Sequence, residues 1–150
     1  MTNESGSVPR VSWFAKLAFS MQAFLLKRGW MGPAGNFLMA ITTTGRKSGK
    51  QFTVPIGYLN DGEAIIAMNP TGNTNWMKNV EANGEALLHI KGQSMPMQGK
   101  LVSDPVEKRR IFDIYKQTPD TFPRYFGVTV DAPERELNAA LNKAHFVRFE

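Results

Sequence analysis

The chain has 150 residues, of which 42% are hydrophobic and 21% charged, a balance that fits one soluble globular domain with a single core. It contains no cysteine, which excludes disulfides, thiolate nucleophiles and cysteine-ligated metal sites. The net charge of +5 is unevenly distributed: the first 60 residues carry seven Lys and Arg against one acid, and the remaining 90 carry eleven against twelve. This local excess favours an anionic partner near the N-terminal part of the chain.

Residues 1–10 are polar and contain Gly and Pro, so we expect a flexible tail before one domain at 11–150. Ser12–Lys27 has apolar residues at helical spacing, with Ser12 as N-cap and Gly29 as a stop. Basic residues flank its apolar face, which leaves three contacts open for this helix: a membrane surface, the body of the domain, or a second subunit of a homodimer. No signal peptide or membrane-spanning run is recognisable, so we expect a cytoplasmic protein, with membrane association as the open alternative.

Phe37–Thr44 and Phe52–Leu59 are rich in residues that favour extended structure. A basic, glycine-containing segment joins them, so the pair predicts a long hairpin with a basic tip. Asn60-Asp61-Gly62 is a strong turn signal, and Glu63–Asn69 continues as a third strand. The three strands together predict a consecutive antiparallel meander.

Thr74–Asn83 predicts a short helix that Gly84 ends. Ala86–Lys91 and Ser94–Val102 follow, and they predict a second hairpin. This part of the chain has no alternating strand and helix rhythm, so a parallel sheet is not expected.

The last third of the chain contains two helix starts. Ser103-Asp104-Pro105 places Pro near a first turn, and Asp131 followed by Glu134 predicts a carboxylate N-cap with a capping glutamate. Phe122–Gly127, between these helices, is expected to be a loop, and Phe146–Phe149 predicts a closing strand. About six strands joined mostly by hairpins, with helices at the N-terminus and late in the chain, predict an α+β fold in which helices surround an antiparallel β-barrel.

His89 and His145 lie far apart, each within an apolar run that predicts a strand. Neither belongs to a local metal-ligand pattern, so both are expected to be structural and no metal site is predicted.

The tip of the first hairpin carries Arg46, Lys47 and Lys50 beside Ser48. A P-loop is excluded because the glycine spacing is one residue short and a strand follows where a helix is required. The charges alone leave two interpretations open: a solvated turn kept soluble by its lysines, or a site that captures an anion through guanidinium and ammonium donors. A nucleic-acid partner is not expected, because residues 42–51 contain no aromatic side chain for base stacking.

Several segments in one order resemble the deazaflavin (F420)-dependent nitroreductase family. The resemblance covers roughly residues 37–150, and the ordered set is more specific than any one of its members. The segments are Thr42–Lys50, Thr53–Tyr58, Asp61-Gly62, Asn75-Trp76 with Asn79, Val80 and Ala82, Arg124–Val128, Asp131–Pro133 and His145–Arg148.

The resemblance implies a split β-barrel oxidoreductase that uses coenzyme F420 to transfer hydride to a small electron-poor acceptor such as a quinone, an activated alkene or a nitroaromatic. The cofactor would carry the chemistry. Two alternatives stay open: a split barrel that binds FMN through the same basic tip, and a non-catalytic protein that binds a cofactor or lipid.

The resemblance also implies roles for particular residues. The basic tip would bind the phosphate and polyglutamate tail, and the Pro55 segment would line the ring with backbone groups. Where many members carry Ser-Lys-Gly-Gly after the third strand, this chain has Asn69-Pro70-Thr71-Gly72. The candidate cofactor-binding residues are Arg46, Lys47, Ser48, Lys50, Pro55, Ile56, Gly57, Met68, Asn69, Pro70, Thr71, Gly72, Asn75, Trp76 and Asn79.

Three of these expectations have specific alternatives. Trp76 could equally be a core aromatic, and the methionines, Met68 included, are expected mainly to fill the core. Tyr125 is the candidate proton donor, because its segment matches a family segment near the substrate mouth and a phenol stays protonated at neutral pH. Tyr58 and solvent are the alternative proton sources.

Overall fold

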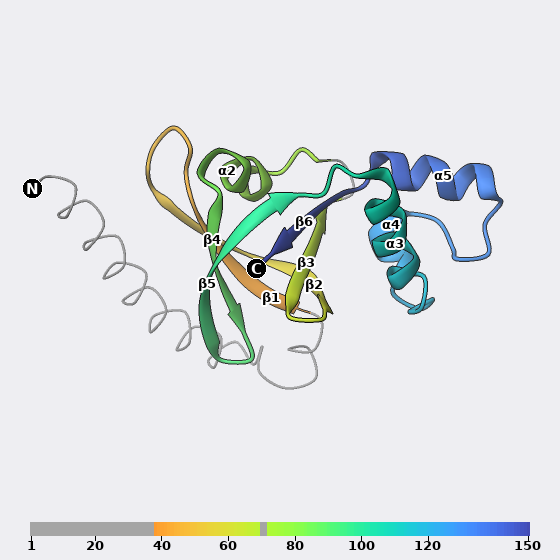
Figure 1. The fold of residues 1–150 in the computed structure, drawn as a ribbon, viewed down its shortest axis with the longest axis horizontal. Helices are drawn as coiled ribbons and strands as arrows, with labels where there is room; N and C mark the ends of the chain where they lie inside the picture. The colour runs from red at the N-terminus through yellow and green to blue at the C-terminus, as the bar shows by residue number, and fades with distance from the viewer. Residues whose placement is uncertain (1–37, 70–71) are drawn as a thin grey trace, which may run out of the picture.

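The computed structural model describes residues 38–69 and 72–150. Within them, six antiparallel strands close into a barrel in the order β1-β2-β3-β6-β5-β4, with four helices at its periphery (Figure 1). The predicted α+β barrel with peripheral helices is therefore confirmed. The elements are β1 Leu38–Thr44, β2 Gln51–Asp61, β3 Ala64–Asn69, α2 Asn75–Asn83, β4 Glu85–Ile90, β5 Gln93–Leu101, α3 Pro105–Tyr115, α4 Phe122–Phe126, α5 Glu134–Lys143 and β6 His145–Phe149. The predictions for residues 1–10 and for Ser12–Lys27 lie outside the described residues.

The barrel interior holds one of two apolar clusters. Alternate side chains of every strand point inward, and the apolar face of α2 covers one end of the barrel. Burying each large apolar side chain contributes about 1.5–3 kcal/mol. The buried members are Met39, Ile41, Tyr58, Ile65, Ala67, Trp76, Met77, Val80, Ala86, Leu88, Ile90, Val147 and Phe149.

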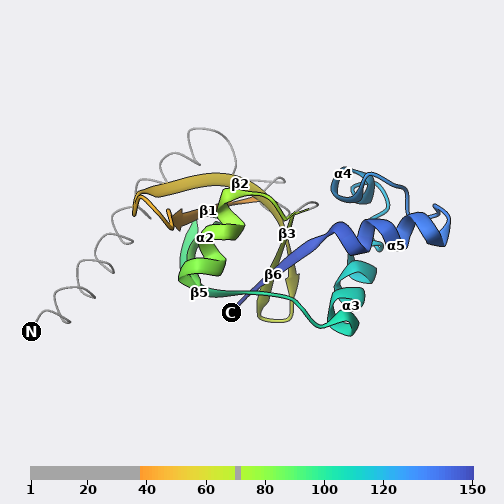
Figure 2. The same ribbon diagram turned by 90° about the horizontal axis from the view of Figure 1, so that it is seen from above.

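The second cluster lies outside the barrel, between the outer face of β3 and β6 and the helices α3, α4 and α5. Figure 2 shows these three helices grouped beside one wall of the barrel, apart from α2. Aromatic rings make up much of this cluster: Phe112 meets Phe122 and Phe126 edge to face at centroid distances of 5.4 and 4.9 Å. Edge-to-face contacts of this kind contribute about 0.5–1.5 kcal/mol beyond burial. The cluster thereby fixes the C-terminal helices to one wall of the barrel.

Strand β2 changes its partner along its length. Its first part pairs with β1, from Gln51 opposite Thr44 to Gly57 opposite Leu38. Pairing with β3 begins only at Tyr58, so within the described residues positions 51–57 have a strand on one edge alone. Pro55 fits here because a proline, which has no N–H to donate, is tolerated where one strand edge is unpaired. The barrel is thus split along the first half of β2.

A polar row runs across strands β2, β1, β4 and β5. Thr42 Oγ1 lies 2.8 Å from Thr53 Oγ1 and 3.0 Å from His89 Nε2, while His89 Nδ1 lies 2.8 Å from Ser94 Oγ. Burial lowers the pKa of His89 to about 4, so the ring is neutral at physiological pH. His89 therefore has the structural role that the sequence predicts.

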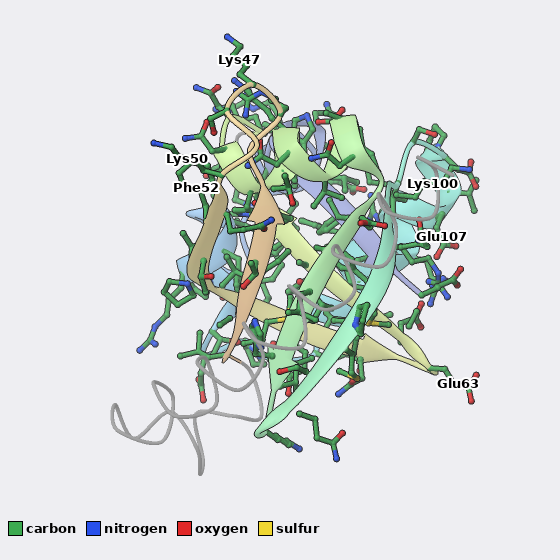
Figure 3. The ribbon with its side chains drawn as sticks, turned by 90° about the vertical axis from the view of Figure 1, so that its left-hand side faces the viewer. Lys47, Lys50, Phe52, Glu63, Lys100 and Glu107 are labelled. Atoms are coloured by element: carbon green, nitrogen blue, oxygen red, sulfur yellow. The ribbon has the colours of Figure 1, made fainter. Side chains whose placement is uncertain are left out.

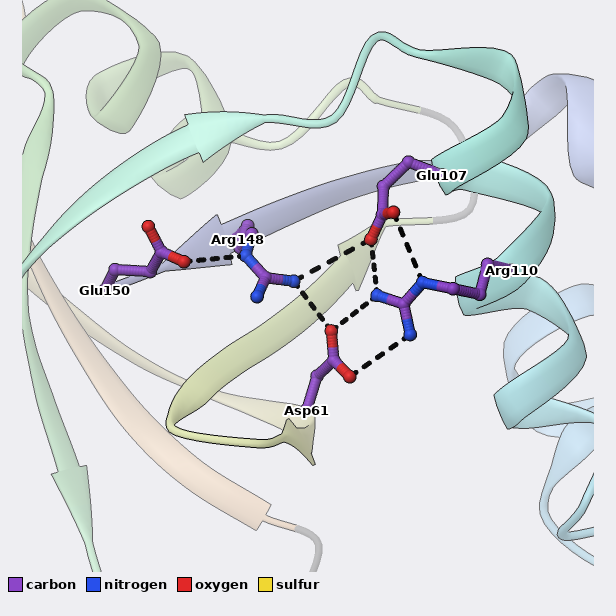
Figure 4. Close-up of polar contacts among 5 residues, drawn as sticks. All are labelled: Asp61, Glu107, Arg110, Arg148 and Glu150. Carbon is purple, nitrogen blue, oxygen red and sulfur yellow. Dashed lines mark hydrogen bonds and ion pairs between the residues drawn. The ribbon is translucent and has the colours of Figure 1, made fainter.

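Five charged side chains tie α3 to the barrel (Figure 4). The carboxylate of Asp61, at the end of β2, accepts hydrogen bonds from Arg110 of α3 at 2.6 and 3.2 Å and from Arg148 of β6 at 2.7 Å. Glu107 bonds Arg110 one turn away, and Glu150 accepts from Arg148 at 2.9 Å. The two guanidinium groups lower the pKa of Asp61 to about 2.

Two local predictions are wrong. The predicted loop at Phe122–Gly127 is the helix α4, because Pro123 fits a first helical turn and Gly127, at φ 74°, ends it with a bond to the Pro123 carbonyl. Asp131 is not the N-cap of α5, which begins at Glu134 after Pro133; the Asp131 carboxylate accepts instead from Thr129 Oγ1 at 2.6 Å. For Asp131, this contact within a local turn replaces the N-cap that the sequence suggests.

We predict that Asp61→Asn lowers the free energy of unfolding by about 1 kcal/mol at neutral pH, a modest value because these ion pairs are partly exposed. The folded-state pKa of Asp61 lies below its unfolded value, so its contribution is present above about pH 4 and is lost as the pH falls toward 2. The free energies of unfolding of the wild type and of Asp61→Asn, measured with urea, should therefore become equal as the pH falls. Glu63→Gln, which alters an exposed carboxylate of the same hairpin, is the control; a difference that does not depend on pH would contradict the assignment.

Candidate functional site

The basic tip of the β1–β2 hairpin is held by its own backbone. The Gly45 N–H donates to the Lys50 carbonyl at 2.6 Å, and the Gly49 N–H donates to the Gly45 carbonyl at 3.0 Å. Gly49 has φ 72°, a left-handed conformation that favours glycine. The turn leaves the side chains of Lys47 and Lys50 exposed and projecting from the tip (Figure 3).

Helix α2 fixes the third cation of the tip. Asn79, buried on α2, accepts hydrogen bonds at its Oδ1 from the Arg46 backbone N–H at 3.2 Å and from the Arg46 guanidinium at 2.8 Å. Its amide nitrogen donates to Thr43 Oγ1 at 3.1 Å. A guanidinium has five N–H donors, so Arg46 keeps donors for a ligand after this bond.

A pocket of about 280 Å³ lies between the hairpin tip and α2. It brings together six residues that the family resemblance assigns to the cofactor: Arg46, Lys47, Ser48, Asn75, Trp76 and Asn79. Trp76 is only 7% exposed and belongs to the barrel interior as well, so both of its expected roles are compatible with its position.

Four further residues that were not predicted from the sequence line the pocket: Thr43, Gly45, Phe52 and Val54. Phe52 and Val54 are 48% and 37% exposed, which is unusual for large apolar side chains on a strand. Because they are two residues apart in β2, they lie on one face of the strand. This period-2 pattern is the sequence signal that could have predicted them as lining residues. The pocket therefore combines an apolar wall with guanidinium, ammonium and hydroxyl donors, a donor set that fits a ligand with an anionic tail.

The segment Pro55, Ile56 and Gly57 lies beyond this pocket on the same strand. Its side chains do not share one face: Ile56 packs against the barrel interior, whereas Pro55 and Gly57 belong to the outer face. The three residues lie in the part of β2 whose second edge has no strand partner in the described chain. Backbone groups rather than side chains are thus what this segment offers to a ring.

The remaining candidates lie elsewhere. Met68 is 7% exposed and belongs to the aromatic cluster under the C-terminal helices. Asn69 donates to Thr74 Oγ1 at 2.6 Å at the end of β3, and Gly72 lies against the imidazole of His145. Pro70 and Thr71 are outside the described residues. Lys50 projects from the tip without lining the pocket.

A second cavity, of about 610 Å³, lies between β2 and the α3–α4 segment. The chain has three tyrosines, and all three line this cavity: Tyr58 from β2, Tyr115 from α3 and Tyr125 from α4. Tyr58 and Tyr125 are the two predicted proton donors, and both residues contact this cavity. Their side chains belong to different clusters: Tyr58 packs in the barrel interior, and Tyr125 packs against the aromatic cluster outside it. Tyr115 was missed, because its place in an amphipathic helix suggests only a core residue.

Burial raises the pKa of each phenol. For Tyr115, whose side chain is 3% exposed, the rise is the largest, and the nearby Tyr125 adds to it. Burial is also the leading cause for Tyr58 and Tyr125. All three hydroxyls are therefore protonated at neutral pH and can donate hydrogen bonds.

No cluster of three His, Asp or Glu side chains that could hold a metal ion occurs in residues 38–69 and 72–150. Within the same residues, none of the helices has the length and apolar character needed to span a membrane.

The sequence model of one protein family matches residues 26–131, a range that includes the hairpin-tip pocket and every tyrosine. That family is the F420H(2)-dependent quinone reductases. The chain belongs to this family. It is accordingly an oxidoreductase, and its implied cofactor is coenzyme F420. No curated protein matches the sequence.

Solved structures agree on the fold. One described as a domain-swapped dimer is 19% identical, with a TM-score of 0.55 over 75% of this chain and 79% of that chain. An F420-dependent reductase is 18% identical, with a TM-score of 0.50 over 74% of this chain and 92% of that chain. A Listeria innocua protein described as a pyridoxamine 5′-phosphate oxidase is 12% identical, with a TM-score of 0.54 over 89% and 92%. At these identities the likeness shows the split-barrel fold alone.

We predict that Asn79→Ala lowers the free energy of unfolding by about 1–3 kcal/mol, because it leaves Thr43 and the Arg46 backbone N–H without their buried partner. Asn83→Ala, on the same helix, removes one exposed bond to the Thr44 carbonyl and should cost less. Urea unfolding of both variants measures the difference. Equal losses would show that Asn79 does not organise the hairpin tip.

Proposed function

We propose that the chain reduces a small quinone-type acceptor with reduced coenzyme F420, binding the anionic tail at the hairpin tip and the acceptor in the tyrosine-lined cavity. The observation that supports this most is the placement of six family-assigned residues around one pocket, within the range that the family model matches. Activated alkenes and nitroaromatics are the alternative acceptors.

The hairpin tip supplies the binding energy for the tail. Arg46, oriented by Asn79, offers a planar fork of donors to a phosphate or carboxylate, and Lys47 and Lys50 add two flexible cations. The Ser48 hydroxyl, which accepts a hydrogen bond from the Lys50 backbone N–H at 3.2 Å, lines the same pocket. Three cations are more than a single phosphate requires, which supports a cofactor with several negative charges.

The middle of β2 connects the two cavities. Val54 lines the first and Tyr58 lines the second, and four residues of extended chain span about 13 Å. The residues assigned to the ring lie between them, with one backbone edge free of strand pairing in the described chain. When bound, the reduced cofactor supplies the hydride.

The acceptor side supplies hydrogen-bond donors. A quinone that receives hydride gains negative charge on an oxygen and takes up a proton to become the hydroquinone. Tyr125 is the proposed donor, since it is half-buried and protonated. Tyr58 is the alternative: it is 4% exposed, and its side chain belongs to the barrel interior. Leu59 and Ile114 add apolar walls that help to exclude water from the cavity.

We predict that Arg46→Ala and Lys47→Ala each weaken F420 binding by about 1–3 kcal/mol and reduce its salt dependence. Fluorescence titration measures both effects. Lys100→Ala is the matched control, because this exposed lysine of β5 lies away from the tip (Figure 3).

The same titration with FMN tests the cofactor. We expect tighter binding of F420, because FMN carries only one phosphate for the three cations. Equal or tighter FMN binding would favour an FMN-dependent split barrel, and unchanged curves in both tip variants would show that the lysines serve solubility alone.

We predict that Tyr125→Phe lowers quinone turnover by about tenfold to a hundredfold with F420 affinity intact, because only the hydroxyl is lost. Tyr58→Phe should cost less if Tyr125 is the donor. Steady-state kinetics of both variants, with cofactor binding measured separately, decides between them. Wild-type turnover in Tyr125→Phe would remove Tyr125 from the mechanism.

A further inference from the structure

The Tyr125 phenol occupies the space of a missing side chain. A Cβ atom on Gly57 would overlap the Tyr125 hydroxyl oxygen and would lie 3.0 Å from both Cε1 and Cζ of the ring. Gly57 does not have a positive φ, so its backbone would accept any residue. What requires glycine at this position is therefore the approach of Tyr125 and not the conformation of the strand.

A second contact also fixes the Tyr125 ring. Tyr115 meets it at a centroid distance of 5.2 Å and an interplanar angle of 63°. Tyr115 is itself held between Phe126, edge to face at 5.5 Å, and Phe146, stacked at 5.8 Å. Tyr125 thus contacts both a group of packed aromatic rings and the bare backbone of β2.

The Tyr125 hydroxyl has no hydrogen-bond partner within residues 38–69 and 72–150. The Tyr115 hydroxyl is likewise unpartnered there, and it is buried. A phenol placed only for core packing would be expected to bond its hydroxyl to the protein or to be replaced by phenylalanine, since an unmet buried donor is costly. Both side chains line the 610 Å³ cavity, but the Tyr115 hydroxyl oxygen is buried, so Tyr125 is the one of the two from which a ligand oxygen in the cavity could accept.

We propose that Gly57 is a positioning residue: its missing side chain lets the Tyr125 hydroxyl rest against β2 at the wall of the cavity, with its proton free for the acceptor. The inference rests on the proposed function for the identity of the acceptor, but the placement of Tyr125 stands on the contacts alone. Gly57 also lies at the point where β2 leaves β1 for β3, so the hydroxyl is fixed at the end of the free strand edge.

The test uses Gly57→Ala, Tyr125→Phe and the double variant. As a single substitution, Gly57→Ala should displace the Tyr125 phenol and lower quinone turnover by about tenfold. Tyr125→Phe removes the overlapping oxygen and leaves only the 3.0 Å contacts. The double variant should therefore match Tyr125→Phe, because the two changes act through one hydroxyl.

A second readout needs no cofactor. Uniform fluorotyrosine labelling gives one fluorine resonance for each of the three tyrosines, assigned through their phenylalanine variants. Gly57→Ala should move the chemical shift of the Tyr125 fluorine toward that of a solvent-exposed fluorotyrosine. Gly99→Ala is the control: its Cβ would meet Val80 and Phe149 inside the barrel, so it should lower stability while the Tyr125 resonance and turnover stay unchanged.

Wild-type turnover with an unmoved Tyr125 resonance in Gly57→Ala would overturn the proposal. So would a further loss when Gly57→Ala is added to Tyr125→Phe, since Gly57 would then act independently of the hydroxyl. If the wild-type protein does not reduce quinones with F420, the proposed function fails, but the fluorine spectra still decide whether Gly57 positions Tyr125.

Discussion

Strand β2 pairs with β1 up to Gly57 and with β3 from Tyr58, and the rest of the structure depends on this change of partner. A strand paired on both edges along its whole length would close the barrel completely and bury its backbone groups. Here the first half keeps one edge free in the described chain, which accommodates Pro55 without loss of a ladder bond. One cavity opens at each end of this segment, so a single strand relates the basic tip to the tyrosines.

Different interactions stabilise the two ends of β2. At the tip, hydrogen bonds dominate: buried Asn79 orients Arg46, while Lys47 remains exposed to attract an anion from solution. At the other end, the ion pair between Asp61 and Arg110 and the aromatic cluster under α3 and α4 fix Tyr115 and Tyr125. This division is consistent with a site that must capture a charged ligand at one end and hold a reacting group still at the other.

Local signals predicted most of the elements, whereas the candidate site residues came from the family resemblance. The turn at Asp61, the start of α3 at Asp104 and the stop at Gly84 each depend on neighbouring residues, so they are legible in one sequence. The closing pairs β3–β6 and β5–β6 depend on contacts between distant segments, which no local pattern records. Tyr115 was not predicted because its role also depends on contacts between distant segments. The close approach of Tyr125 to Gly57 likewise depends on the packing of α4 against β2, which no local pattern records.

Amide hydrogen exchange with and without coenzyme F420 tests the central claim that the cofactor lies along the first half of β2. The account predicts slower exchange at residues 45–58 when the cofactor binds, with the β4–β5 hairpin unchanged as an internal reference. Binding that protects the β4–β5 hairpin and leaves residues 45–58 unaffected would contradict it.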